Sequence, residues 1–333
     1  MTPVYIAFTP QGKALADSLA SVLGGDAARC GEPMGLREWT AAHFQTGSSL
    51  VFVGAAGIAV RAIAPHLGDK TTDPAVVVVD EGGRFAIPIL SGHQGGANDL
   101  ARAIGRVCGA QPVLTTATDI NGVFAVDQWA KRQHCAILDP GRIKTVSGRL
   151  LAGGTVRVRS DWPIQGEPPV GVAVTEGEDC NIRLSVHKME ESEALLRLVP
   201  RIAVLGVGCK RGTTQDALEA ALTALLDRSG LYGQAIRGLA TIDRKKDEPG
   251  LLAFSKAHGW PLAAYTAEQL RQTAGEFSAS AFVERTTGVD NVCERAAVLA
   301  AGGPIIQKKE AGGGITMAAA LELYRPTWRW RDE

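Results

Sequence analysis

A histidine stands in an unusually bare loop, in the stretch "LSGHQGGAND" that covers residues 90–99. The side chain of His93 has an unperturbed pKa near ~6.5, which suits proton transfer at neutral pH. Glycines on both sides leave the ring little steric cover, and an apolar, strand-like run precedes the loop. Because sites in α/β proteins collect at the carboxyl ends of strands, we predict that His93 acts as an acid or base. The alternative is a surface histidine in a flexible turn.

Two acidic residues, Asp80 and Glu81, follow the apolar run of residues 75–79, which is the earlier of the two apolar runs before the histidine loop. They stand in "DEGGRF" between two apolar stretches, a pattern that predicts a β-hairpin over residues 75–90. Asn98, at the other end of the histidine loop, is predicted to be the N-cap of the next helix.

Two cations follow a glycine-ended strand in "GAAGIAVRAIAPHLGDKTTDP", residues 54–74. Gly54 and Gly57 allow a sharp strand-to-helix turn that leaves backbone N–H groups for an anion. Arg61 lies one turn into the helix, where a guanidinium can bind a carboxylate bidentately, and Lys70 lies on the next loop. These residues predict an anion site, and solvated cations beside strand-ending glycines are the alternative.

A second glycine-rich loop, "GVGCKRGTT", covers residues 206–214. Its glycines, Gly208 among them, open a helix, and Lys210 and Arg211 stand between them. Backbone N–H groups, the helix dipole and two cations together predict an anion site. The lysine precedes the last glycine, so the loop does not match a P-loop. A tight turn with solvated cations is the alternative.

Three further side chains of this segment have predicted roles. Thr213 is a hydroxyl donor for a ligand or a helix cap, and Asp216 follows it with the spacing of a capping box. Cys209 precedes a helix, where thiol pKa values fall, but no histidine is near it in sequence. We therefore take Cys209 as a spectator rather than a nucleophile.

The charged run "TIDRKKDEPG", residues 241–250, follows another strand-like stretch. We predict that Arg244 and Lys245 face the same opening as Lys210, although a charge run is often only a solvated surface. A nucleotide- or S-adenosylmethionine-dependent transferase would need an acidic residue soon after the glycine loop. Asp243 comes about 35 residues after that loop rather than ~20, which argues against this class.

Composition excludes several other classes. Lys plus Arg and Asp plus Glu both number 35, and aromatic residues make up 5%, so nucleic-acid binding is not expected. No H-E-x-x-H, G-x-S-x-G or C-x-x-C motif occurs, so we predict no catalytic metal, serine triad or zinc framework. Six widely spaced cysteines, no signal-peptide pattern and no membrane-length apolar run predict a soluble cytoplasmic protein.

The elements that must position these residues alternate between strand and helix. Strands are predicted at 4–8, 49–57 and 112–117 besides the hairpin, with helices at 12–23, 58–67, 98–109 and 122–133. This alternation predicts an N-terminal α/β sheet domain over residues 1–134. The pattern weakens over residues 135–200, which we interpret as a small middle module and linker.

A third block restarts at residue 201 and runs to residue 333. Strands are predicted at 201–208, 238–243 and 261–266, and residues 304–320 have the pattern of a closing hairpin. Residues 209–226 are predicted to be a loop that leads into a helix. Further helices are predicted over 248–259, 267–272 and 291–302, with Thr266 and Gln269 as a capping box. The sequence therefore predicts an α/β chain of two sheet domains around a middle module.

The segments just quoted resemble one family. Residues 54–101 are similar to the N-terminal half of the CbiG family, the cobalt-precorrin-5A hydrolases of anaerobic cobalamin biosynthesis. Residues 206–222, with "LATIDRKKDEPGLLAFSKAHGWPL" and "GVDNVCERAA", resemble its C-terminal domain, which also occurs alone as CobE. The resemblance covers nearly the whole chain and is weakest in the middle block.

The resemblance implies a reaction and a substrate. The family opens the δ-lactone of a cobalt-corrinoid with water and releases acetaldehyde, so cobalt arrives inside the substrate and no cofactor of the protein's own is expected. The expected partner is this polyanionic tetrapyrrole, and neither nucleic acid nor a membrane is expected. A homodimer and hand-over to other pathway enzymes stay open, as does a non-catalytic corrinoid carrier.

On this substrate the candidate residues take chemical roles. We predict that His93 activates water or carries the proton, that Glu81 orients His93, and that amides near Gly95 and Gly96 stabilise the oxyanion. The other candidates are predicted to bind the substrate or its carboxylates: Gly57, Arg61, Lys70, Gly208, Lys210, Arg211, Thr213, Arg244 and Lys245.

Overall fold

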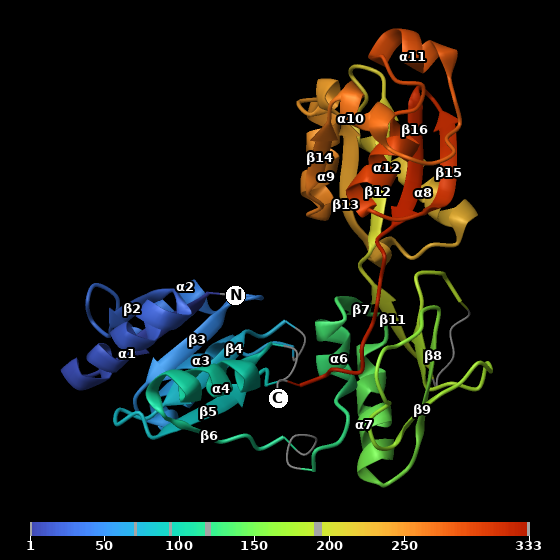
Figure 1. The fold of residues 1–333 in the computed structure, drawn as a ribbon. Helices are drawn as coiled ribbons and strands as arrows, with labels where there is room; N and C mark the ends of the chain where they lie inside the picture. The colour runs from blue at the N-terminus through green and yellow to red at the C-terminus, as the bar shows by residue number, and fades with distance from the viewer. Residues whose placement is uncertain (1, 70–71, 93–94, 117–120, 190–194, 332–333) are drawn as a thin grey trace. The chain divides into compact units, whose positions relative to one another are not determined.

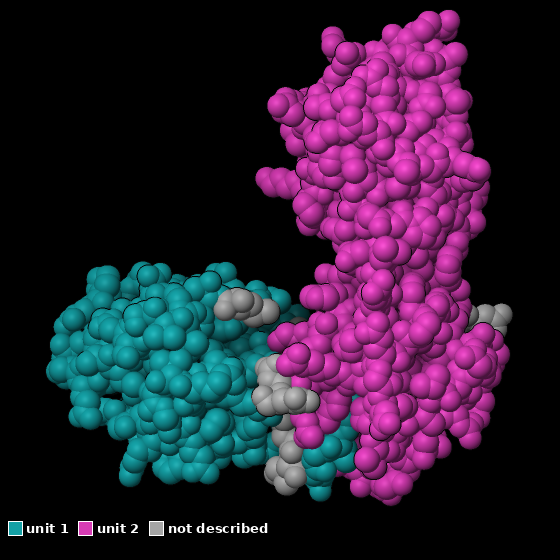
Figure 2. All heavy atoms as spheres, viewed as in Figure 1, with its two compact units in different colours: residues 1–128 teal, residues 129–333 magenta. Residues whose placement is uncertain are grey.

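The computed structural model describes residues 2–69, 72–92, 95–116, 121–189 and 195–331 (Figure 1). Contacts group the chain into two compact units, residues 1–128 and 129–333 (Figure 2). Three sheets alternate with helices along the sequence, which confirms the predicted α/β class. The three-part domain division stays a prediction about which segments fold on their own.

The first unit is built on a six-stranded sheet. Its strands are, in spatial order, β2 (Asp26–Arg29), β1 (Pro3–Ala7), β3 (Ser49–Val53), β4 (Ala75–Val79), β5 (Phe85–Leu90) and β6 (Gln111–Pro112). Neighbouring strands are parallel except β4 and β5, which form the predicted antiparallel hairpin. The carboxyl end of β5 therefore lies at the edge where β4 begins.

Helices cover both faces of this sheet (Figure 1). They are α1 (Pro10–Leu23), α2 (Leu36–His43), α3 (Ala56–Ile63) with the 3₁₀ turn η1 (Ala64–His66), and α4 (Ala97–Cys108). Successive strand residues point to opposite faces. Tyr5 and Val51 pack with α1 and α4, whereas Ile6 and Phe52 pack with α2 and α3. The inner strands β1, β3 and β4 are therefore buried on both faces, as is typical of parallel strands.

Three predictions made for residues 98–133 need correction, and two elements were not predicted. The strand predicted at 112–117 is only Gln111–Pro112, and the helix predicted at 122–133 is α6 (Val126–Arg132). Strand β2 and helix α2 were not predicted, because the short edge segment "DAAR" has no strand-like apolar pattern. Asn98 does not cap α4: Gly96 is the N-cap, and Asn98 lies buried inside the first turn.

The second unit begins with the middle module, which is more ordered than the sequence predicted. Its five-stranded sheet has the order β7 (Cys135–Ile137), β11 (Leu196–Pro200), β10 (Ile182–Leu184), β8 (Val156–Ser160) and β9 (Val172–Val174). The turn η2 (Pro140–Arg142) leads into helix α7 (Ile143–Leu151). The charged stretch interpreted as linker ends in β11, a fully buried inner strand.

The C-terminal sheet has five strands in the order β14 (Leu262–Tyr265), β13 (Ile236–Ile242), β12 (Ala203–Cys209), β16 (Ile315–Leu321) and β15 (Ile305–Gly312). Strands β12, β13 and β14 are parallel, and β15 and β16 form the predicted antiparallel hairpin. The carboxyl ends of β12 and β13 thus place their following loops at one edge of the sheet.

Helices cover both faces of the C-terminal sheet as well. They are α8 (Gln215–Ser229), α9 (Pro249–His258), α10 (Ala267–Gln272), α11 (Ala281–Thr287) and α12 (Cys293–Ala301), with turns η3 (Gly233–Ala235) and η4 (Asp243–Lys245). Leu218 of α8 and Phe254 of α9 pack on one face, and Ala296 of α12 packs on the other. The capping box of Thr266 and Gln269 is confirmed. Among the described residues, no helix is long and apolar enough to cross a membrane.

Candidate functional site

The carboxyl ends of β1 and β4 bring Thr9 and Glu81 together. The Thr9 hydroxyl donates a 2.5 Å hydrogen bond to Glu81 Oε1 and accepts one from the Gly12 N–H as the N-cap of α1. Asp80 beside them holds the turn, because its Oδ1 accepts the N–H groups of Arg84 and Phe85. Burial raises the Asp80 pKa, but these hydrogen bonds lower it more, so the carboxyl titrates below its ordinary value.

The predicted anion residues of α3 lie at this same edge of the sheet, because α3 follows the carboxyl end of β3. Gly57 lies in the first turn of α3, and Arg61 is exposed in its last turn. Within the described part of the chain, no side chain forms an ion pair with Arg61, which leaves its guanidinium available to a carboxylate. Gly54 has φ 158°, and a Cβ there would lie 2.7 Å from the Phe8 ring.

The loops that carry His93 and Lys70 lie at the opposite edge. Both residues are outside the described part of the chain, but their neighbours are inside it. The Ser91 hydroxyl donates 2.8 Å to the Asp73 carbonyl, which joins the two loops beside the start of β4. The contact between these loops in the structure is therefore that of Ser91 with Asp73.

This arrangement bears on the predicted Glu81–His93 pair, which stays a prediction because His93 lies outside the described residues. Glu81 follows β4, whereas Ser91 and Gly92 follow β5, which runs antiparallel to it. The six residues of β5 separate the two ends by roughly 20 Å. Glu81 and the described residues beside His93 thus follow opposite ends of the β4–β5 hairpin.

The glycines of the histidine loop serve local packing. A Cβ on Gly92 would lie 2.7 Å from Asn98 Oδ1, and one on Gly95 would lie 2.4 Å from the Ser91 Cβ. Gly96 has φ 87°, in the left-handed region that favours glycine. The N–H groups of Gly95 and Gly96 donate to no described residue, so they are available to an anion.

The C-terminal sheet brings the loop of residues 209–214 against the start of α9. Glu248 Oε1 accepts the Gly212 N–H at 2.6 Å, and Glu248 Oε2 accepts Lys245 Nζ at 2.9 Å. A Cβ on Gly250 would lie 1.9 Å from the Thr213 carbonyl, so α9 touches the loop backbone. Glu248 has no role in the sequence analysis; its three-residue spacing from Lys245 was the signal for this pair.

The charge of Glu248 is held in place by its donors. The hydrogen bond from Lys245, followed by that from the Gly212 N–H, lowers the pKa of the Glu248 carboxyl, more than burial raises it. Lys245 is therefore engaged by a carboxylate of the protein itself. Its predicted role toward a substrate carboxylate stays a prediction, with this ion pair as a competitor.

The remaining predicted cations differ in what they contact. Lys210 and Arg211 are exposed, and their charged groups form no ion pair within the ranges that the structure describes. The stem of Lys210 lies against the β15–β16 turn, where a Cβ on Gly314 would meet its Cδ at 2.7 Å. Arg244 donates from Nη1 to the Thr286 carbonyl of α11 at 2.8 Å. Lys210 and Arg211 are thus two predicted cations of this edge that a carboxylate can reach.

Packing and hydrogen bonding within the protein account for two other predicted residues of this loop, Gly208 and Thr213. A Cβ on Gly208 would lie 2.5 Å from Thr316 Oγ1, so this glycine makes room for β16. Thr213 is buried and donates to the Lys210 carbonyl at 2.9 Å, and the N-cap of α8 is Thr214. The predicted capping box of Thr213 and Asp216 is therefore wrong: the cap lies one residue later, and Thr214 accepts the N–H of Ala217.

Cys209, taken as a spectator, is not activated in the structure. Burial raises the pKa of its thiol above the ordinary value, against a smaller lowering by the charge of Lys245. The thiolate that nucleophilic attack needs is therefore disfavoured at neutral pH. This agrees with the spectator interpretation.

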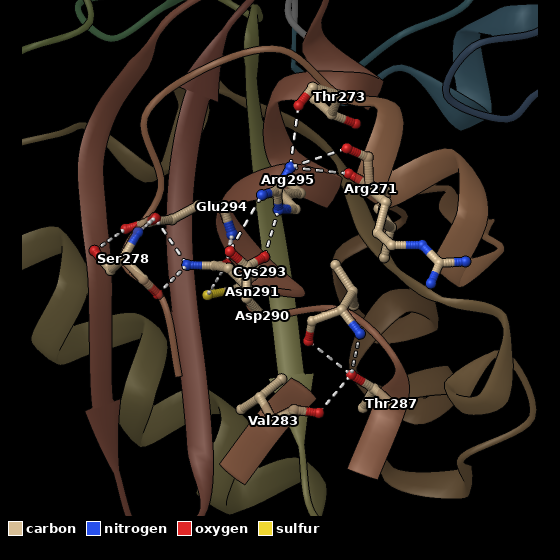
Figure 3. A network of polar contacts seen from close by, with 12 residues as sticks. Arg271, Thr273, Ser278, Val283, Thr287, Asp290, Asn291, Cys293, Glu294 and Arg295 are labelled. Atoms are coloured by element: carbon tan, nitrogen blue, oxygen red, sulfur yellow. Dashed lines mark hydrogen bonds and ion pairs between the residues drawn. The ribbon is translucent and has the colours of Figure 1, made fainter. Parts of the chain in front are cut away.

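A buried ionic cluster lies at the start of α12 (Figure 3). The Glu294 carboxylate is fully buried and accepts hydrogen bonds from the Ser278 N–H and hydroxyl, the Asn291 amide and the Lys309 N–H. Beside it, Arg295 binds Asp290 through two nitrogens. Backbone and side-chain groups of the protein donate all of these hydrogen bonds to Glu294. We therefore assign the cluster a structural role at the start of α12.

No metal site emerges from the described residues. Among them, no group of three or more His, Cys, Asp or Glu side chains is placed to hold a metal ion. The expectation that the protein has no metal of its own stays a prediction.

The chain matches two family models in the same order as its sheets. The model described as "Cobalamin synthesis G N-terminal" matches residues 38–119, and "Cobalamin synthesis G C-terminus" matches residues 203–320. The C-terminal part is 33% identical over 100 residues to "Protein CobE" of Sinorhizobium sp, covering 30% of this chain and 65% of that protein. The predicted CobE-like character of this part is confirmed.

Two relatives extend the similarity over most of the chain. The cobalt-precorrin-5A hydrolase of Salmonella typhimurium is 35% identical over 301 residues, which cover 83% of each protein. The cobalt-precorrin-5A hydrolase of Priestia megaterium is 31% identical over 301 residues, covering 84% of this chain and 80% of that protein. The chain therefore belongs to the CbiG family of cobalt-precorrin-5A hydrolases.

Proposed function

We propose that this chain hydrolyses the δ-lactone of cobalt-precorrin-5A and releases acetaldehyde, giving cobalt-precorrin-5B. The observation that carries this function is the 35% identity to the Salmonella hydrolase over 83% of both proteins. The reaction is a hydrolysis, and the cobalt enters and leaves within the corrinoid. We therefore propose that the protein supplies proton transfer and charge stabilisation rather than a cofactor.

The reaction needs two steps that balance with one water. Water adds to the lactone carbonyl, the acyl–oxygen bond breaks, and a carboxylate and a free hydroxyl result. A base then takes the hydroxyl proton, the carbon–carbon bond to the ring breaks, and acetaldehyde leaves. The electron pair passes to the ring carbon, which takes up a proton. The protein must supply an oxyanion donor, a base and an acid.

We propose that His93 carries these protons and that the N–H groups of Gly95 and Gly96 bind the oxyanion. The amides are supported because neither N–H donates to a described residue. They lie beside the turn in which Ser91 donates a hydrogen bond to the Asp73 carbonyl. His93 itself lies outside the described part of the chain, and its role rests on its chemistry and its loop. The pairing of Glu81 with His93 stays a prediction, with β5 between Glu81 and the described residues beside His93.

We propose that exposed cations bind the carboxylates at the rim of the substrate. Arg61 in the first unit and Lys210 and Arg211 in the second are exposed and without an ion-pair partner in the described ranges. A guanidinium binds a carboxylate through two parallel hydrogen bonds, so Arg61 and Arg211 suit this role best. Lys70, Arg244 and Lys245 stay predictions, the last two with partners of their own.

The test compares His93→Gln with His187→Gln, a control at an exposed histidine. Both variants are incubated with cobalt-precorrin-5A, and acetaldehyde is measured as it forms. We expect His93→Gln to lose roughly 10²–10⁴-fold in rate, the range for removing a general acid or base, and the control to keep the parent rate. A His93→Gln rate near that of the parent would exclude the proton-transfer role.

The same assay decides between an enzyme and a carrier. If the unaltered chain binds the corrinoid but forms no acetaldehyde, it is a carrier rather than a hydrolase. We also propose that the reaction takes place in the cytoplasm, since the six widely spaced cysteines suit a reducing compartment. A homodimer and hand-over of product stay predictions, which size measurement with and without the next enzyme would test.

A further inference from the structure

A cavity of the second unit lies where the chain returns to the middle module after its last strand. The volume of the cavity is about 570 Å³, within the roughly 300–1,000 Å³ typical of small-molecule sites. Its walls come from residues 132–134, at the end of α6, and from residues 322–329, which follow β16. Sequence reasoning had assigned no function to either segment.

The lining of this cavity is strongly cationic, although the chain as a whole carries no net charge. Arg132, Arg325 and Arg329 line it together with His134. The lining has one acidic residue, Glu322, and this carboxylate already lies 3.0 Å from the guanidinium of Arg237. The lining therefore keeps an excess of positive charge that an anionic ligand would neutralise.

Two of these cations are available to a ligand. Arg325 and Arg329 are exposed, and within the described ranges neither side chain forms a hydrogen bond or an ion pair. Leu323 is 65% exposed and also lines the cavity, so apolar surface stands beside the charges. A ligand with an apolar body and peripheral carboxylates matches both features.

The floor of the cavity is rigidly built. Gln133 is buried, and its side-chain amide binds the backbone of the returning segment: Oε1 accepts the Thr327 N–H at 3.0 Å and Nε2 donates to the Arg329 carbonyl at 3.3 Å. The Tyr324 hydroxyl donates to the Gln133 carbonyl at 2.9 Å. These bonds fix the backbone that carries Arg325 and Arg329, which lowers the ordering cost of binding.

The backbone at His134 is strained. Its φ is 54°, in the left-handed region that favours glycine. The Arg201 N–H donates to its carbonyl, and its own N–H donates to Lys131, so two bonds hold this conformation. Strain of this kind is found where a side chain must be presented in one direction.

A second cavity of the same unit is less suited to an anionic ligand. Its volume is about 360 Å³, and alanines of α8 and the β15–β16 turn line it. The one cation of its lining, Arg228, already forms an ion pair with Glu310. Apolar walls with a neutralised charge do not select a polyanion.

We propose that the cavity between residues 132–134 and 322–329 binds carboxylates at one edge of the tetrapyrrole substrate. This proposal rests on the proposed function for the identity of the ligand, and it assigns a site that the glycine-rich loops do not contain. Arg325 and Arg329 bind the carboxylates, and Leu323 lies under the edge of the ring. The cavity volume fits an edge with its acidic side chains rather than a whole macrocycle.

The experiment measures binding by the full chain without turnover. The probe is cobyrinic acid, a cobalt corrinoid whose side chains end in free carboxylates, and titration calorimetry gives its Kd. The double variant Arg325→Ala, Arg329→Ala is compared with Arg37→Ala, Arg285→Ala, which removes two exposed arginines elsewhere and changes the net charge equally. We expect the first variant to bind at least about tenfold more weakly, and the control to bind within about twofold of the parent.

A second ligand and a second readout make the result decisive. Cobinamide has the same ring with amidated side chains, and we expect it to bind the parent weakly and both variants equally. Equal cobyrinic acid affinity of the two double variants would overturn the proposal, as would no binding of cobyrinic acid by the parent. Acetaldehyde release by the parent is measured in parallel, so that loss of the proposed function and loss of this site are separate results. Unchanged thermal unfolding of the variants shows that the cavity has kept its fold.

Discussion

Single residues show where sequence reasoning succeeds and where it stops. Lys245 was predicted to bind a substrate carboxylate because its charge and position were visible in the sequence. Its actual partner, Glu248, is three residues away, but the second donor to that carboxylate is the Gly212 N–H, 36 residues distant. Residue types can be read from one sequence. The ion-pair partner of a charged side chain depends on which loops the sheet brings together.

The Glu248 ion pair predicts a pH dependence of stability. Because hydrogen bonds hold the folded-state pKa of Glu248 below its ordinary value near 4.5, the ionised carboxylate stabilises the fold above that value. This stabilisation is lost as the pH falls through the lowered pKa. We expect Glu248→Gln to lower the free energy of unfolding at about pH 7 by about 1–2 kcal/mol, and this difference to shrink by about pH 3.5.

Urea unfolding at several pH values checks this expectation. Glu176→Gln is the matched control, since Glu176 is exposed and has no partner within the described residues. Its free energy of unfolding should follow that of the parent at every pH. A gap between Glu248→Gln and the parent that stays constant down to about pH 3.5 would contradict the assigned pKa shift.

At the scale of elements, apolar periodicity predicted most strands and helices. It did not predict at which edge of the sheet the loop after each strand lies. The hairpin of β4 and β5 was predicted, and its antiparallel pairing already placed the histidine loop opposite Glu81. The tendency of sites to lie at the carboxyl ends of strands does not say which edge of a sheet is meant when two strands run antiparallel. The strands β2, β9 and β10 were not predicted for a different reason: they have only four, three and three residues, too few to show a regular apolar pattern.

Close contact between α12 and β12 predicts a large effect of one methyl group. A Cβ on Gly206 would lie 1.7 Å from the Cys293 carbonyl oxygen, a backbone atom that no rotamer change can move. Gly206→Ala must push α12 away from the sheet, and we expect it to lower the free energy of unfolding by about 3 kcal/mol or more. Chemical denaturation of the purified variant measures this.

A second glycine is the control for this substitution. Gly148 lies on the exposed side of α7, where a Cβ would meet nothing within 4 Å. Gly148→Ala should raise the free energy of unfolding by about 0.5–1 kcal/mol, because alanine loses less backbone freedom in a helix. If both alanines had the same effect, the contact between α12 and β12 would not be the cause.

At the scale of the whole molecule, the path of the chain through the second unit stands out. After β16 the chain runs back to the middle module, where residues 324–331 pack on α6 and on the loop at Gln165. Trp328 stacks on Trp129 with ring centroids 5.3 Å apart, and the Trp129 indole donates to the Thr327 carbonyl at 2.7 Å. Gln165 donates to the Pro326 carbonyl and accepts the Trp328 N–H. No local pattern predicts these contacts, because nearly 200 residues separate Trp129 from its partners.

This returning segment predicts that the last residues stabilise the middle module. Trp328 is 6% exposed, so Trp328→Ala should lower the free energy of unfolding by about 3–5 kcal/mol and free α6 and the Gln165 loop. Hydrogen exchange should therefore rise in peptides that cover residues 126–137 and 162–165, while peptides of β1 and β3 in the first unit keep their protection. A chain that ends at Leu323 should show the same pattern more strongly, and one that ends at Arg331 should behave as the parent. Unchanged exchange in residues 126–137 after loss of Trp328 would mean that the middle module holds together without its C-terminal segment.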